Sequence, residues 1–85
     1  MNGRQQEILF YLNRTQLTGL GCLAFLAIRE KSTIEYQWKK RGFTDLTHEA
    51  ILGFNQLNDA ALLELAYSVT THLSEDLTTN EKAIS

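Results

Sequence analysis

The chain has 85 residues, of which 44% are hydrophobic and 21% charged, and its net charge is −2. This length fits one domain, and the ordinary balance of apolar and charged residues excludes a disordered chain. The longest run with no charged and almost no polar residue, residues 17–28, is shorter than the roughly 20 apolar residues of a transmembrane helix, and it lacks the flanks of a signal peptide, so no membrane role is expected.

Charge is divided unevenly along the chain. Residues 1–42 hold seven lysines and arginines against three glutamates, a net charge of +4, whereas residues 43–85 hold one lysine against seven acids, a net charge of −6. Such asymmetry indicates either a basic half that meets nucleic acid or an acidic partner, or two halves that complement each other within the fold or across a dimer.

The first 29 residues show helical periodicity. From Gln5 onward, apolar residues recur every three or four positions, the spacing of one helix face. The polar residues 13–15 and the pair Gly19 and Gly21 weaken the middle of this pattern. Two alternatives follow: one bent helix over residues 4–29, or two helices broken near residues 13–18.

The segment Leu17–Ile28 is the most apolar part of the chain. Its large side chains point in every direction around a helix axis, and a helix that is apolar all round must be buried on more than one side. A chain this short can hardly cover it, so we predict that a second copy completes the burial as a two-fold homodimer in which one patch pairs with itself. A monomer is the alternative if the last helix and the Trp38 region wrap the segment.

Cys22 lies within this apolar segment, where a thiol behaves as a small hydrophobic side chain. We therefore expect it to be buried and unreactive. Because a single cysteine cannot form an internal disulfide, we expect the protein to reside in a reducing cytoplasm.

Residues 32–41 can be read in two ways. Ser32 and Glu35 have the spacing of a capping box, and three cations followed by Gly42 are typical of a helix end. Against this, the apolar residues at 34, 36 and 38 alternate with polar ones, as in a half-buried strand. The start and stop signals agree with a helix, and a lone strand would have no partner, so we favour a helix.

The second half of the chain predicts two more helices. Caps at residues 44–47 precede a short helix over 48–56, and Asn58 caps an amphipathic helix from Asp59 to Leu77. Residues 78–85 are small and polar, and we predict that they form a flexible C-terminal tail. The expected fold is therefore all-α, a compact bundle of four or five short helices in a single domain over residues 1–77.

No motif indicates catalysis or cofactor binding. Residues 19–24 match the pattern G-x-G-x-x-A of dinucleotide-binding proteins, but the strand that must precede the motif is missing. His48, His72 and Cys22 do not have metal-site spacing, and no carboxylate pair suggests an acid and a base. We expect no catalytic residue, no cofactor and no metal, and hence not an enzyme.

The basic stretch around Trp38 provides the strongest candidate for binding. Aromatic residues alternate with cations there, a composition that can neutralise phosphates and stack on bases. The predicted helix pair 48–56 and 59–74 does not form a DNA-reading unit, because its second helix is acidic. We predict a non-catalytic protein-interaction module, an adaptor or regulator that self-associates, with a nucleic-acid-binding accessory protein as the alternative. The predicted partner-binding residues are Arg29, Lys31, Tyr36, Trp38, Lys39, Lys40 and Arg41.

Overall fold

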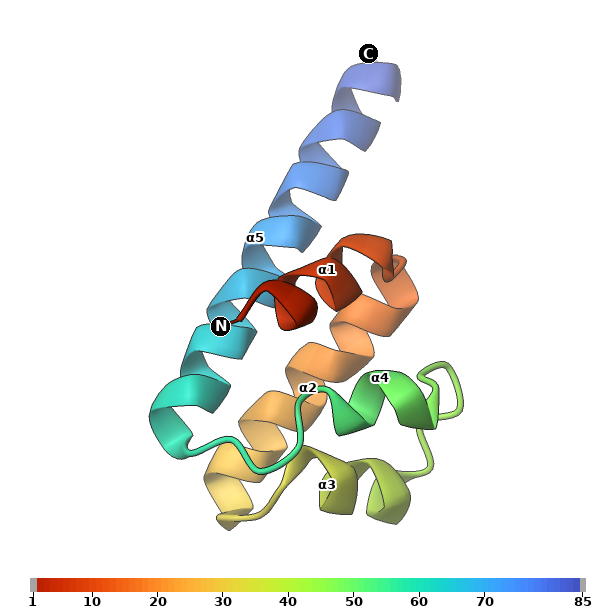
Figure 1. Ribbon diagram of the computed structural model, residues 1–85. Helices are drawn as coiled ribbons and strands as arrows, with labels where there is room; N and C mark the ends of the chain where they lie inside the picture. The colour runs from red at the N-terminus through yellow and green to blue at the C-terminus, as the bar shows by residue number, and fades with distance from the viewer. Residues whose placement is uncertain (1, 85) are drawn as a thin grey trace.

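The computed structural model describes the backbone of residues 2–84 and the side chains of residues 2–75. Within these residues the chain forms five helices and no strand, which confirms the predicted all-α bundle. The helices are α1 (Gly3–Tyr11), α2 (Arg14–Glu30), α3 (Ile34–Arg41), α4 (His48–Leu52) and α5 (Asp59–Ile84), as Figure 1 shows.

The chain breaks between α1 and α2, so the two-helix alternative is the right one. Leu12 and Asn13 both adopt extended backbone conformations. Asn13 then caps α2, because its Oδ1 accepts a hydrogen bond from the Gln16 amide at 2.9 Å and Gln16 Oε1 accepts one from the Asn13 amide at 2.9 Å. This reciprocal pair satisfies two amides that a helix start leaves without partners.

Residues 34–41 form a helix, α3, and not a strand. Its cap is Thr33, whose Oγ1 accepts from the Tyr36 amide at 3.0 Å. The predicted capping box of Ser32 and Glu35 is therefore wrong by one residue, and the Ser32 hydroxyl instead accepts a hydrogen bond from the buried Gln37 side chain at 2.8 Å. Gly42 ends the helix with a left-handed φ of 69°, as predicted.

The fourth helix is shorter than predicted and the fifth is longer. Helix α4 ends at Leu52 rather than at residue 56, and Gln56 takes a left-handed φ of 62° in the connection to α5. Asn58 caps α5 as expected, because its Oδ1 accepts from the Ala61 amide at 2.8 Å. Helix α5 extends to Ile84 and so includes most of residues 78–85; their side chains lie outside the described part, and the predicted flexible tail stays untested.

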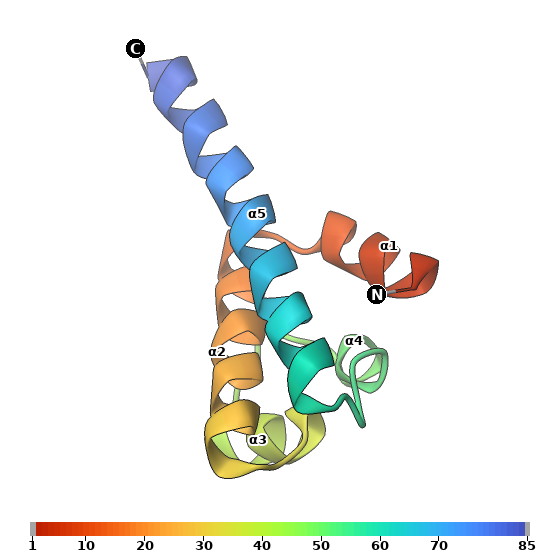
Figure 2. The same cartoon turned by 90° about the vertical axis from the view of Figure 1, so that its left-hand side faces the viewer.

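Helices α2 and α5 lie side by side and antiparallel, and α1, α3 and α4 pack on one side of this pair (Figure 2). The C-terminal part of α5 extends past the other helices. Gly21 faces Val69 of α5, whereas Gly19 faces Phe43 and Leu46 on the opposite side of α2. The segment Leu17–Ile28 is thus buried on two sides, and it supplies much of the core. The core residues are Leu9, Leu17, Leu20, Leu23, Ala24, Ala27, Ile34, Leu46, Ile51, Phe54, Leu62, Leu65, Ala66 and Val69.

One stripe of α2 is left uncovered. Thr18, Cys22 and Phe25, spaced four and three residues apart, are exposed, and 56% of Phe25 is accessible. The expectation that Cys22 is buried is therefore wrong, because Cys22 borders two open hollows, one shared with α5 and one shared with Phe43 and Asp45. Among the described residues, no helix is long and apolar enough to cross a membrane.

Candidate protein-interaction surfaces

The predicted partner-binding residues lie at the end of the molecule where α2 ends and α3 packs against it. Arg29 and Lys31 are exposed at the C-terminus of α2, and the three cations 39–41 are exposed at the C-terminus of α3. Glu30 stands between Arg29 and Lys31 in the sequence, but its contacts with α3 cannot be read from the sequence. Its carboxylate accepts from Lys40 Nζ at 3.0 Å and from Arg41 Nη2 at 2.7 Å.

These contacts change the electrostatics of this end of the molecule, which we name the basic end and which comprises residues 29–31 and 36–41. The Lys40 ammonium, followed by the Gln37 side chain and the Arg41 guanidinium, lowers the pKa of Glu30 to about 2. Glu35 takes up a third cation, because its carboxylate lies 3.0 Å from Lys39 Nζ one helical turn away. Three of the five predicted cations are therefore paired within the chain, and their attraction for phosphate is correspondingly weaker.

The two aromatic residues of the basic end differ in accessibility. Tyr36 is 53% exposed, and Lys40 Nζ lies 5.8 Å from the centre of its ring. Trp38 is half-buried and packs against the core. The His48 imidazole covers the Trp38 indole, with ring centres 5.2 Å apart and planes 6° from parallel. Stacking of bases on the Trp38 ring would have to displace His48 from that side.

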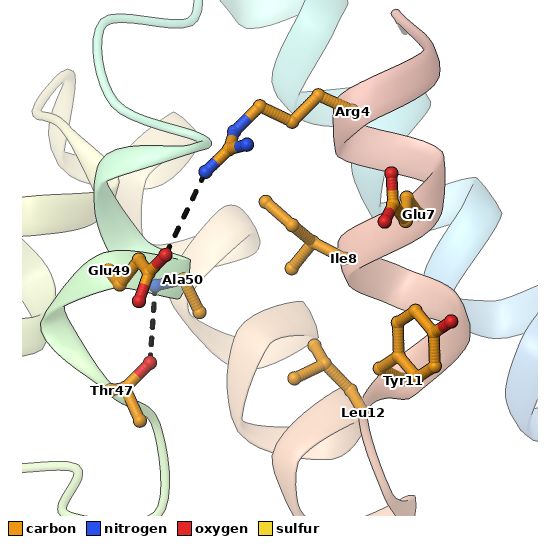
Figure 3. Close-up of a pocket in the computed structure, with 8 residues that line it drawn as sticks. All are labelled: Arg4, Glu7, Ile8, Tyr11, Leu12, Thr47, Glu49 and Ala50. Carbon is orange, nitrogen blue, oxygen red and sulfur yellow. Dashed lines mark hydrogen bonds and ion pairs between the residues drawn. The ribbon is translucent and has the colours of Figure 1, made fainter.

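Figure 3 shows a pocket of about 290 Å³ between α1 and α4. Ile8 and Leu12 point from the side of α1 toward Ala50 of α4, and these three side chains form the apolar part of the pocket lining. At its rim Arg4 Nη2 lies 3.9 Å from Glu49 Oε1, in an ion pair that joins the basic half of the chain to the acidic half. Both side chains are largely exposed, so this rim is a weak electrostatic contact.

A second hollow, which we name the α1/α5 crevice, is lined by Gln6 of α1 and by Tyr67, Ser68, Thr71 and His72 of α5. Two exposed aromatic residues lie at the crevice: Tyr67, which lines it and is 75% exposed, and Phe10, which is 74% exposed and lines a neighbouring hollow that shares His72.

The aromatic surface continues on both sides of the crevice. Tyr11 is exposed and packs edge-on against Phe10, with ring centres 5.4 Å apart. Leu63, one turn before Tyr67 on α5, is 59% exposed. An apolar and aromatic surface with a polar floor therefore spans α1 and α5. In the sequence pattern, Leu63 and Tyr67 stand beside the apolar stripe of α5, and this position is the signal of a possible binding surface. The pattern alone does not tell whether another helix covers these two side chains.

The third hollow, the α2/α5 groove, lies on the open face of the α2 and α5 pair. It encloses about 200 Å³, and its lining is almost wholly apolar. The lining residues are Thr18, Gly21, Cys22 and Phe25 of α2 and Ala66, Val69, Thr70 and Leu73 of α5.

The three hollows contain no arrangement of polar groups suited to a bound metal. Among the described residues, no three His, Cys, Asp or Glu side chains come together as a metal site would require. What the surfaces offer instead is apolar and aromatic area, which favours contact with protein. Comparison of the chain with protein-family models, with curated proteins and with solved structures found no match.

Proposed function

We propose that this chain is a non-catalytic protein-interaction module, an adaptor or regulator that docks a partner protein and also self-associates. The observation that carries the proposal is the exposure of large apolar side chains. Five of the eight aromatic residues, together with two leucines, are more than half exposed. Aromatic side chains can bury more apolar area than any other residue type, so leaving most of them outside the core indicates surfaces that another protein covers.

The α1/α5 crevice is the surface that we assign to the partner protein. Phe10 and Tyr67 lie at it as two rigid aromatic anchors, the residue type that dominates binding energy at protein interfaces. Gln6, Thr71 and His72 provide hydrogen-bonding groups between these anchors. A central polar strip with aromatic edges suits a helix or loop of a partner better than a small ligand, because the hollow is shallow and open.

Ion pairing within the basic end favours a protein partner over a nucleic acid. Glu30 and Glu35 pair with Lys40, Arg41 and Lys39, so the cations that would contact phosphates are already engaged. The predicted partner-binding set from Arg29 to Arg41 remains a proposal for a secondary contact with acidic protein surfaces. We also propose the cytoplasm as the compartment, because the one thiol of the chain is free and exposed, which fits a reducing environment.

The test is capture of bound proteins from an extract of the source cells with three immobilised forms of the chain. The double variant F10S/Y67S removes the aromatic anchors of the α1/α5 crevice. The control Leu52→Ser removes another exposed apolar side chain, 52% accessible, from α4, away from the crevice. We expect a protein that is retained by the wild type and by Leu52→Ser and is lost from F10S/Y67S. Equal retention by all three forms, or none above the empty support, would contradict the assignment.

A further inference from the structure

The open face of the α2 and α5 pair raises the question of what covers the α2/α5 groove. Thr18, Cys22, Phe25 and Thr70 are exposed there, and no other helix of the chain packs over them in the described part (Figure 2). We call the position of a residue along the common direction of α2 and α5 its height. Because the two helices are antiparallel, residues of equal height lie opposite each other across the groove floor. Gly21 contacts Val69, and Phe25, one turn further along α2, lies toward the N-terminal end of α5.

We propose that the groove is covered by the same groove of a second copy, with a two-fold axis parallel to α2 and α5. In this arrangement each α2 packs on α5 of the second copy, and four helices form an antiparallel bundle around the axis. The inference rests on the self-association that is part of the proposed function. It adds which helices of the two copies meet, and which of their residues lie at equal height.

Charge complementarity selects the helices that meet. Helix α2 carries two arginines against one acid, Glu30, and this carboxylate is already held by α3. In the part of α5 whose side chains the structure describes, residues 59–75, there is no lysine or arginine, and acids include Asp59 and Glu75. Packing α2 on α5 of the second copy therefore joins a positive helix to a negative one.

The other two-fold arrangement has its axis perpendicular to the helices, and it places like charges together. Each α2 would then lie antiparallel on its own copy. Arg14 and Arg29 flank Cys22 at nearly equal sequence distances, so Arg14 would come opposite Arg29 of the second copy. The two acidic α5 helices would also face each other. Like charges across an interface oppose association, and this arrangement is disfavoured.

Side-chain size agrees with the parallel axis. A rotation about an axis parallel to the helices keeps every residue at its own height. Phe25, the largest exposed side chain of the groove, then lies across from the part of α5 that contains Ala66, the smallest residue of that wall. Large side chains opposite small ones let facing helices interdigitate.

The same rule of equal height gives a crosslinking test. Cys22 lines the groove beside Gly21, within one helical turn of the level of Val69 and Thr70, and of these two residues Thr70 is exposed. In the proposed dimer Cys22 of one copy faces residue 70 of the other, whereas the two Cys22 residues lie diagonally across the bundle. The experiment mixes untagged wild type, whose one thiol is Cys22, with a tagged double variant, C22S/T70C, and oxidises the mixture. The matched control is C22S/T71C, whose thiol points toward the α1/α5 crevice.

We expect a disulfide-linked product that contains one tagged and one untagged chain, formed with C22S/T70C and missing with C22S/T71C and with each protein alone. If wild type alone crosslinks through Cys22, the axis is perpendicular to the helices and the inference fails. If sedimentation shows a dimer but C22S/T70C crosslinks no better than the control, another surface mediates self-association. If every form sediments as a monomer, the self-association in the proposed function fails as well. Circular dichroism of each variant verifies that it is folded.

Discussion

Gly21 of α2 lies directly against Val69 of α5, and a Cβ added to Gly21 would stand 3.2 Å from Cγ1 of Val69. This contact is what allows the two longest helices to approach closely. It also sets the depth of the α2/α5 groove, because Gly21 and Val69 both line its floor. Gly19, two residues earlier, faces the other side of α2 and has more room: its added Cβ would lie 3.5 Å from the ring of Phe43.

The two glycines should therefore respond differently to alanine. Gly19→Ala places a methyl group at ordinary contact distance in the middle of a helix, and we expect it to stabilise the fold by about 0.5 to 1 kcal/mol. Gly21→Ala gains the same helix propensity, but Val69 must move, so its net gain should be smaller or negative. Urea denaturation of both variants measures the difference. Equal stabilisation by the two substitutions would show that α2 and α5 are not in close contact at Gly21.

The reciprocal hydrogen bonds of Asn13 and Gln16 should contribute measurably to stability. Asn13→Ala removes the acceptor for the Gln16 amide, and loss of such a cap typically costs about 1 kcal/mol. Asn13→Asp, which keeps an acceptor at the same position, is the matched control and should retain most of the stability. Thermal unfolding followed by circular dichroism compares the three proteins. A loss of the same size in both variants would assign the effect to something other than the cap.

The interaction of Glu30 with Lys40 and Arg41 predicts a specific dependence on pH. The pKa of Glu30 is lowered from 4.5 to about 2, so in this range the unfolded chain binds the proton more readily than the folded chain. The contribution of Glu30 is therefore complete above pH 4.5 and is lost as the pH falls through about 2. Glu30→Gln should flatten the fall in stability over this interval, and Lys40→Gln should flatten it in part. Denaturation curves between pH 6 and pH 2 measure the slopes, and an unchanged slope in Glu30→Gln would contradict the assignment.

The sequence predicts the helices well because their start and stop signals are local. Asn58 and Gly42 act as caps where the pattern places them, whereas the pattern leaves open whether one bent helix or two helices form over residues 4–29, and the structure places the break at the cap formed by Asn13 and Gln16. The capping residue of α3 is off by one, because Ser32 and Thr33 offer the same hydroxyl. Local spacing does not show that the Ser32 hydroxyl is needed by Gln37.

The interaction surfaces were harder to predict, because exposure depends on how the helices pack. Cys22 lies in the most apolar stretch of the chain, yet it is exposed, since α5 and the connection that holds Phe43 and Leu46 cover other sides of α2. Likewise, Glu30 is a single acid among cations in the sequence. Its effect on the basic end appears when α3 folds back on α2 and brings Lys40 and Arg41 to one carboxylate.

The paired state of the basic end predicts weak nucleic-acid binding. Titration of labelled single-stranded and double-stranded DNA and RNA at two salt concentrations should show no more than weak retention, because Lys39, Lys40 and Arg41 are held by glutamates. Glu30→Gln should strengthen any residual binding by releasing two of these cations. Tight binding that falls steeply with salt and disappears on neutralising residues 39–41 would instead support the nucleic-acid alternative.

Our central proposal is that a second copy covers the exposed apolar face of α2 and α5. Sedimentation equilibrium of the wild type and of Phe25→Lys tests this claim directly, because the substitution places a charge in the α2/α5 groove at an exposed position where folding does not require the ring. We predict that the wild type has twice the 9.7 kDa mass of one chain and that Phe25→Lys sediments as a folded monomer. A wild-type monomer, or a dimer that tolerates Phe25→Lys unchanged, would contradict it.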